Sequence, residues 1–262
     1  MTLPLPLRPN HQVTRSQARL LGVAWFASFL VIWAISRFEV LPSPGDVVRA
    51  LPALLHEQGL LGHLASSLYS NLSALAWAVG LGMFFSYLGV VPALRPLGEL
   101  VSKIRFLGFA GVSVAFALWF ESGHSLKVAL VAFGMTGFVV AGLSDEVHAI
   151  PRDRYDYARS LGMSEWRVVW EVVVLGTLDR ALDVLRQNAA MGWMLLTTIE
   201  TLVRSEGGVG VLFANQTKHL ELSQIAALQL VIFAIGVLQD CALGAFKRLV
   251  CPYTALKSGG TS

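Results

Sequence analysis

Charged residues are scarce in this sequence of 262 amino acids. Asp, Glu, Lys and Arg make up 14% of the chain, whereas about 25% is usual in soluble domains. Hydrophobic residues make up 55%, and the mean hydropathy is +0.61. A soluble core does not account for this excess, because apolar runs recur at close to the roughly 17 to 25 residues that cross a bilayer. The composition therefore predicts an all-α, polytopic membrane protein.

Cysteines and catalytic motifs are also scarce. The two cysteines, Cys241 and Cys251, lie at the end of the last apolar run and just beyond it. Two cysteines alone make no zinc site. The phosphate-binding motif GxxxxGK[ST] is absent, as are HExxH, CxxC and GxSxG, and the six histidines are scattered without metal-ligand spacing. These absences predict a chain that is not an enzyme and holds no metal or cofactor.

Six apolar segments are predicted to cross the membrane. In chain order they cover residues 20–36, 64–94, 106–120, 128–144, 187–199 and 222–239, and the fifth is shorter and more polar than the rest. The first could instead be a secretory signal, but it is longer than a usual signal core, and AISRFEV offers no A-x-A cleavage site. We therefore expect one membrane domain over residues 17–250, between tails of residues 1–16 and 251–262.

Two connecting segments have predicted roles of their own. Residues 41–64 show apolar residues at helical spacing and are predicted to form an external amphipathic helix along the membrane surface. It is open whether this helix only connects two spans or docks an external partner. Residues 91–103 are predicted to be a short cytoplasmic turn.

Lysine and arginine are unevenly distributed between alternate loops. Loops that stay in the cytoplasm keep positive charge, and with a cytoplasmic N-terminus fifteen of the 20 basic residues lie on that side. The basic residues left on the other side are Arg37, Arg49, Lys127, Arg204 and Lys218. Both tails are therefore predicted to be cytoplasmic. The net charge of +3 follows from these loops and forms no single stripe of the kind that binds nucleic acid.

One densely charged segment, residues 145–180, interrupts the apolar sequence. Such a segment cannot lie in hydrocarbon, and the charge count places it in the cytoplasm. Pro151 favours a helix start and Gly162 suits a C-terminal turn, so a short helix is predicted over residues 152–162. A second helix then begins with Glu165 in its first turn. The residues expected to project from this unit into a soluble partner are Tyr155, Tyr157, Ala158 and Leu161.

This segment resembles the cytoplasmic signature of the permeases of ATP-binding-cassette importers, which reads EAA, three residues, Gly, nine residues, Ile, one residue, Leu, Pro. The matching positions are Asp156, Tyr157 and Ala158 at EAA, Gly162 at the glycine and Val172 at the isoleucine. Tyr157 replaces a small residue, and Leu175 stands in place of the proline. Together with LPSPGDVVRAL, LWFESGHSLKVALVAF and IETLVRSEGGVGVLFANQ, the segment is similar to permeases of the nitrate, sulfonate and taurine importer branch.

The resemblance implies a type I importer permease in the bacterial inner membrane. Its partners would be a second permease copy or paralogue, a cytoplasmic ATP-binding subunit that hydrolyses ATP, and an extracytoplasmic substrate-binding protein. The solute would be small, such as nitrate, a sulfonate, taurine or bicarbonate, and its identity stays open. The helix over residues 152–162 would couple the permease to the ATPase. The residues implied in coupling are Tyr155, Asp156, Tyr157, Ala158, Arg159, Leu161 and Gly162.

A polar stripe follows one face of the predicted fifth span. Its members, at helical steps of three and four, are Arg186, Ala190, Trp193, Thr197, Glu200 and Arg204. A polar stripe inside a bilayer faces protein or water. One interpretation makes Trp193, Thr197 and Glu200 part of the pathway lining or of its external gate. The other pairs Glu200 with Arg204 and packs this face against another subunit, with Arg186 reaching the cytoplasmic surface.

Predictions remain for Asp240, for the glycine segment after the fifth span and for the function. Asp240 is expected to be offset by Lys247 or Arg248, and the glycines of SEGGVGVLF are consistent with a re-entrant or gate-forming segment. An ion-coupled secondary transporter stays open as an alternative function, with Glu200 as its main intramembrane acid. A membrane anchor for a soluble complex, without transport, is the second alternative.

Overall fold

Helices make up the regular structure of the chain. The computed structural model describes residues 14–35, 42–121, 123–204 and 206–252, and within these ranges it contains no strand. The predicted all-α class is confirmed. The predicted tails, residues 1–16 and 251–262, lie mostly outside the described residues.

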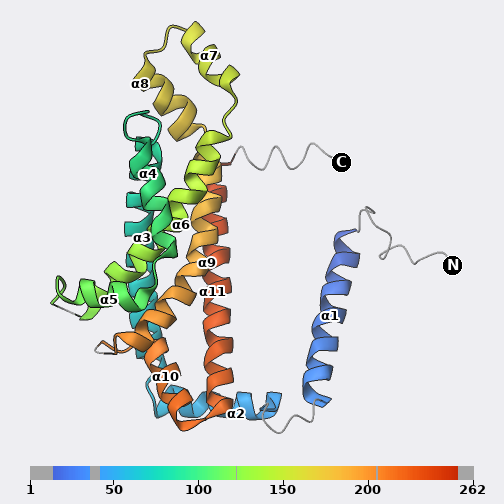
Figure 1. The fold of residues 1–262 in the computed structure, drawn as a ribbon. Coiled ribbons are helices and arrows are strands. Elements are labelled where there is room, and N and C mark those ends of the chain that lie inside the picture. The colour runs from blue at the N-terminus through green and yellow to red at the C-terminus, as the bar shows by residue number, and fades with distance from the viewer. Residues whose placement is uncertain (1–13, 36–41, 122, 205, 253–262) are drawn as a thin grey trace.

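Four long helices pack side by side as the body of the molecule (Figure 1). They are α3 (Leu60–Leu88), α6 (Gly123–His148), α9 (Leu178–Leu202) and α11 (Leu222–Val250). Helix α6 lies at the centre, and the main hydrophobic core forms where it meets α3 and α9, around Leu130, Met135 and Leu196. Burial of this apolar surface holds the bundle at this level.

Helix α1 (Arg15–Ile35) stands apart from the other helices in Figure 1. Its large apolar side chains, Trp25 and Phe26 among them, are exposed. Near the end of the helix, Trp33 packs against the cluster around Leu54 and Leu228, and its indole donates to the Pro42 carbonyl oxygen at 3.1 Å. The exposed apolar side chains along the rest of the helix are suited to lipid or to another subunit. It is one of four helices that are long and apolar enough to cross a membrane, with α3, α6 and α11.

Helix α9 contains the predicted fifth span but is much longer than residues 187–199. At about 1.5 Å per residue its 25 residues extend about 37 Å, enough to cross a bilayer. It is less apolar than α1, α3, α6 and α11, because it carries charged residues such as Asp183, Arg186 and Glu200. These charges pair with α6 and α11, as described below.

The third predicted span is not one continuous helix, and most of the predicted turn before it is helical. Residues 95–106 form helix α4 (Arg95–Ser102) and the 3₁₀-helix η2 (Lys103–Phe106). Helix α5 (Phe109–Ala117) follows at 108° to this pair. The break lies at Leu107 and Gly108, whose ψ angles of 130° and 132° are extended and cannot continue a helix. Among the described residues, four helices are long and apolar enough to cross a membrane, or five if this bent pair is one span, and α9 adds one more polar helix.

Helix α2 (Pro44–His56) confirms an amphipathic helix within residues 41–64, although residues 60–64 belong to α3. Ser43 begins it with a capping box, in which Asp46 takes part, and these hydrogen bonds lower the pKa of the Asp46 carboxyl. Val47 and Leu54 are buried on the face that packs against α11. Figure 1 shows α2 lying across one end of the bundle, next to the short helix α10 (Val209–His219).

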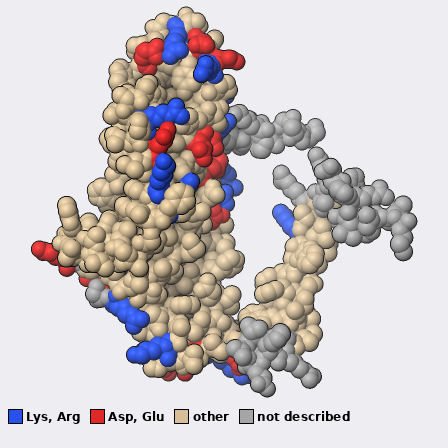
Figure 2. All heavy atoms as spheres, in the orientation of Figure 1, with Lys and Arg blue, Asp and Glu red and all other residues tan. Residues whose placement is uncertain are grey.

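The opposite end of the bundle carries the charged segment. There, α7 (Arg152–Ser160), α8 (Glu165–Val168) and the π-helix η3 (Val169–Leu175) lead from α6 to α9. On the face drawn in Figure 2, charged side chains gather at this end, and fewer lie at the end with α2 and α10. This distribution suits a bundle that crosses a membrane with the charged segment outside the hydrocarbon.

Candidate functional site

The hairpin, residues 152–175, stands beyond the ends of α3, α4 and α9 (Figure 1). Its turn is a Schellman motif. The Gly162 amide donates to the Arg159 carbonyl oxygen at 2.9 Å, and the Met163 amide donates to the Ala158 carbonyl oxygen at 3.4 Å. Gly162 has φ +75°, and no heavy atom lies within 4 Å of the place where a Cβ would stand. Glycine is favoured there by backbone conformation and not by close packing within the chain.

Arg159 ties the two halves of the hairpin together. Its Nε and one terminal nitrogen donate to the two carboxylate oxygens of Glu165 at 2.9 and 3.1 Å, and a third bond reaches Asp156 at 3.3 Å. A bidentate pair of this kind fixes geometry as well as charge. The hydrogen bonds from Arg159 lower the pKa of Glu165, and Glu165 raises the pKa of Arg159. Arg159 therefore positions α7 against α8.

The exposed surface of the hairpin is apolar and aromatic. Tyr157 is 68% exposed and Leu161 is 58% exposed, and the Trp166 ring of α8 is also exposed. Ala158 is only 4% exposed, so the prediction that it projects outward is wrong. It lies at the bottom of a cavity of about 390 Å³ between α7 and η3, which Tyr157 and Leu161 also line.

Helical structure continues where the family signature has a proline. Leu175 ends the π-helix η3, and the chain passes through Gly176 and Thr177 into α9. A Cβ at Gly176 would lie 2.2 Å from the Val172 carbonyl oxygen, so this wide turn needs glycine. The Thr177 hydroxyl donates to the Val173 carbonyl oxygen at 2.7 Å and satisfies an acceptor near the helix end.

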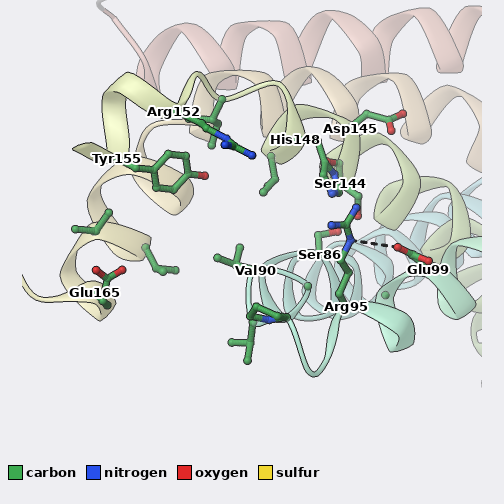
Figure 3. Close-up of a pocket in the computed structure, with 18 of the residues that line it drawn as sticks. Ser86, Val90, Arg95, Glu99, Ser144, Asp145, His148, Arg152, Tyr155 and Glu165 are labelled. Atoms are coloured by element: carbon green, nitrogen blue, oxygen red, sulfur yellow. Dashed lines mark hydrogen bonds and ion pairs between the residues drawn. The ribbon is translucent and has the colours of Figure 1, made fainter. Parts of the chain in front are cut away.

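A cavity of about 1080 Å³ separates the hairpin from the bundle (Figure 3). Tyr155 and Arg152 point into it from α7, and Arg95, which pairs with Glu99 at 3.2 Å, lies across the gap. Burial raises the pKa of Tyr155. Unlike Tyr157, Tyr155 thus faces the bundle. The cavity was not predicted, because the segments that line it are distant in sequence.

A groove of about 440 Å³ runs between α9, α10 and α11. Trp193 and Thr197 line it, as the predicted polar stripe requires, together with Phe213, Gln229 and Asp240. The Trp193 indole donates to the side-chain oxygen of Gln239 at 2.7 Å, which fixes the ring. Exposed polar side chains on membrane helices face protein or water, so this groove suits either a pathway or a subunit interface.

Glu200 lies outside this groove, in a fully buried cluster. Both Glu200 and Lys127 of α6 are 0% exposed, and their charged groups lie 3.2 Å apart. The carboxylate also accepts from the Ser67 hydroxyl at 2.8 and 2.9 Å and from the Gly210 amide at 2.8 Å. The interpretation that pairs Glu200 with Arg204 is wrong, since Arg204 donates instead to the Thr201 carbonyl oxygen.

The same cluster holds the glycine segment that follows α9. Lys127 donates to the Gly207 carbonyl oxygen at 3.3 Å, and His63 Nδ1 accepts from the Gly208 amide at 2.9 Å. The Gly208 backbone has φ +124°, and a Cβ there would lie 2.2 Å from the Glu200 carboxylate. Lys127, assigned to an external loop by the charge count, is therefore an internal residue that anchors this segment.

The remaining charges of α9 also pair differently from the prediction. Arg186 makes a bidentate ion pair with Asp240 of α11, and Lys247 pairs with Asp183. Asp240 is therefore not offset by Lys247 or Arg248. These pairs join the first part of α9 to the last part of α11 and explain how a polar helix is accommodated in the bundle.

Comparisons with known proteins agree with this architecture. A family model described as "Binding-protein-dependent transport system inner membrane component" matches residues 23–250. The taurine transport system permease protein of Escherichia coli is 27% identical over 249 residues, which cover 89% of each chain. The bicarbonate transport system permease protein of Synechococcus elongatus is 22% identical over 250 residues, 88% of this chain and 89% of that one.

A solved structure shows the same fold. The crystal structure of an amino acid ABC transporter with histidines matches 76% of this chain and 96% of its own, with a TM-score of 0.56 and 15% identity. Taken with the helical bundle and the projecting hairpin, the family match over residues 23–250 decides the assignment. The chain belongs to the inner membrane components of binding-protein-dependent transport systems, as a multi-pass ABC importer permease subunit that is not itself an enzyme.

Proposed function

We propose that the hairpin is the contact through which a cytoplasmic ATPase drives this permease. The observation that carries the proposal is the exposed pair Tyr157 and Leu161 on an element that stands clear of the bundle. Tyrosine is among the residues enriched at the energetic centres of protein interfaces, and Leu161 adds apolar surface that a partner can bury. Arg159 and Gly162 hold the shape, Asp156 and Ala158 support it, and Tyr155 faces the cavity behind.

The solute we propose is a small anion or zwitterion such as nitrate, a sulfonate, taurine or bicarbonate. Support comes from the relatives, one named for taurine and two for bicarbonate. The pathway would run along the groove at Trp193 and Thr197. Glu200 would not line the pathway. It would hold in place the glycine segment after α9, at the external end of the pathway. Family membership favours this importer over an ion-coupled transporter or a non-transporting anchor.

Topology and assembly follow from the same proposal. We place the hairpin and both tails in the cytoplasm, in line with the distribution of Lys and Arg, and keep residues 17–250 as the membrane domain. The groove face of α9 and α11, where Met194 and Phe233 are exposed, would meet a second permease copy or paralogue. A binding protein would dock at the end that carries α2 and α10.

The test is to purify the permease with its ATPase and to remove the exposed hairpin anchors. Tyr157→Ser with Leu161→Ser is expected to lower the affinity for the ATPase about tenfold or more, since buried interface anchors each contribute more than about 1 kcal/mol. Leu249→Ser, at an exposed leucine near the end of α11, is the matched control. Unchanged ATPase binding in the double variant would refute the coupling role. Uptake of taurine and of bicarbonate by the reconstituted complex then tests the solute separately.

A further inference from the structure

Four consecutive backbone positions after α9 are each held by a side chain from elsewhere in the bundle. The positions are Gly207, Gly208, Val209 and Gly210, and their partners in the same order are Lys127, His63, Ser67 and Glu200. The partners belong to α3, α6 and α9. The first two positions have φ angles of +70° and +124°. Because glycine populates many backbone conformations, these side-chain bonds, and not the backbone itself, fix the path of the glycine segment.

The hydrogen bond at Gly208 requires a neutral imidazole on His63. The Gly208 amide can only donate, and its acceptor, Nδ1 of His63, lies 2.9 Å away. Nδ1 therefore carries a lone pair, and the single ring proton is on Nε2. In a protonated histidine both ring nitrogens are donors. Protonation of His63 thus removes this bond and sets two N–H groups against each other.

Protonation would also leave the Gly208 amide without an acceptor. Gly208 is buried, and a buried donor that loses its acceptor is unfavourable. The imidazole lies close to the segment, since a Cβ at Gly207 would stand 3.2 Å from its Nδ1 and Cε1 atoms. Relief of the contact between the two N–H groups therefore requires that the ring or the segment move.

Among the four anchoring side chains, His63 is the one suited to respond to pH. Histidine is the side chain whose ordinary pKa lies between about pH 5 and 8. Ser67 is a hydroxyl, and Lys127 and Glu200 form an ion pair. These three side chains are fully buried, whereas His63 is half-buried, so protons from the solvent can reach it.

The described charges around His63 do not compensate its cationic form. Glu200 of α9 is already paired with Lys127 of α6, and none of the described ion pairs involves His63. His124 of α6 stacks instead on the ring of Tyr69. The neighbouring α2, glycine segment and α10 carry exposed titratable side chains, which are His56, Glu57, Arg204, Glu206, Lys218 and His219. A proton on His63 thus adds a positive charge next to the segment residue that Lys127 holds.

Release of Gly208 would reach α10 and the groove. Helix α10 begins at Val209, directly after Gly208. Phe213, one helical turn further on, lines the groove between α9, α10 and α11. The position of Phe213 therefore depends on the bonds that hold the start of α10.

We propose that His63 is a pH-sensitive positioning residue. As a neutral imidazole it holds the glycine segment and the start of α10 in place, and on protonation it releases them. The effect on transport rests on the pathway proposed along the groove, with this end of the bundle facing the external solution. Acidification outside the cell would then loosen the external end of that pathway.

The test measures hydrogen exchange of residues 206–212 in the complete permease, purified with its ATPase in nanodiscs, at about pH 8 and about pH 5. After correction for intrinsic pH effects, wild type is expected to lose protection about tenfold at the lower pH, as for one buried amide left unpaired. His63→Asn should keep high protection at both pH values, because the asparagine side-chain oxygen accepts a hydrogen bond and does not titrate. His63→Ala should have low protection at both.

His124→Asn is the matched control and should keep the wild-type response, because His124 lies one turn before Lys127 on α6 and contacts Tyr69. A pH response that persists in His63→Asn overturns the proposal, as does wild-type protection that is the same at both pH values. Protection in His63→Ala equal to that of wild type at the higher pH also overturns it. Exchange needs neither solute nor transport, so these outcomes are independent of the pathway and of the ATPase contact proposed above.

Discussion

Single residues account for the shape of the hairpin and for the external end of α9. Gly162 is needed for its positive φ and not for close packing, because the space around its Cβ position is open. Gly208 is needed for both reasons, since its φ is positive and the Glu200 carboxylate occupies the place of a side chain. Gly162 therefore serves the backbone conformation alone, whereas Gly208 also serves close packing, and substitutions at the two positions are expected to have different effects.

Replacement of Gly162 by alanine is predicted to weaken coupling without removing the protein from the membrane. A residue other than glycine in the left-handed backbone conformation costs about 1 to 2 kcal/mol. The native turn after α7 would therefore form in a smaller fraction of the molecules. ATP hydrolysis stimulated by a loaded binding protein should fall several-fold. Gly162→Asn is the control, because asparagine tolerates this conformation and should retain most of the activity. Equal activity in the alanine variant would show that the turn is not needed for coupling.

Removal of either partner of the Lys127 and Glu200 pair is predicted to destabilise the bundle. Both side chains are fully buried, and an uncompensated buried charge costs about 3 to 5 kcal/mol. Lys127→Met should therefore lower the thermal unfolding temperature of the purified protein substantially.

The matched comparison uses the other candidate partner of Glu200. Arg204→Gln should have little effect on unfolding, because Arg204 is exposed and its recorded hydrogen bond is to a backbone oxygen. A double-mutant cycle between Lys127 and Glu200 measures the coupling. A loss of stability in Arg204→Gln as large as that in Lys127→Met would contradict the pairing seen here.

At the scale of elements, ion pairs decide how polar helices fit into the molecule. Helix α9 reaches across the bundle despite its charges, because Asp183, Arg186 and Glu200 each pair with α6 or α11. In the hairpin, the pair of Arg159 with Glu165 joins two short helices that would not be stable alone, since isolated short helices are marginal in water. The elements are held by contacts between them more than by their own propensities.

The Arg159 and Glu165 pair predicts the pH dependence of hairpin order. The pKa of Glu165 is lowered in the folded hairpin, so the stabilisation is fully present above the ordinary glutamate pKa and is lost as pH falls through the lowered one. Hydrogen exchange of the α7 amides, corrected for intrinsic pH effects, should thus show constant protection from pH 8 to about pH 5, with loss at lower pH.

Glu165→Gln should reduce the protection of α7 at neutral pH. Arg167→Gln should leave it close to that of wild type, because the Arg167 and Glu171 pair is longer, at 4.0 Å, and lies within one helical stretch. Protection that stays unchanged in Glu165→Gln would mean that this ion pair does not order the hairpin.

At the scale of the whole molecule, a groove separates parts of α9, α10 and α11, whereas the residues around α6 form a packed hydrophobic core. If the groove lines the pathway, Thr197→Cys should react with a water-soluble thiol reagent in the reconstituted complex, at a rate that changes when ATP is added. Ile199→Cys, two residues away and fully buried, should not react. The background carries Cys241→Ser, because Cys241 is exposed. Equal reactivity at both positions would argue against a pathway along this face.

The sequence by itself determined the membrane character, the all-α class and the hairpin. These depend on local patterns: apolar runs of bilayer length, and Pro151 and Gly162 at the ends of one short helix. It did not predict the break at Leu107 and Gly108, because an uninterrupted apolar run without proline gives no local signal for a bend.

Only the tertiary structure decided which charges meet. Glu200 lies one helical turn from Arg204, and that spacing suggested a pair. The real partner, Lys127, is 73 residues away and reaches Glu200 because α6 packs beside α9. The cavity between the hairpin and the bundle is likewise assembled from segments far apart in the chain. Periodicity reports which face of a helix a side chain occupies, whereas its partner depends on how the helices pack, which one sequence does not reveal.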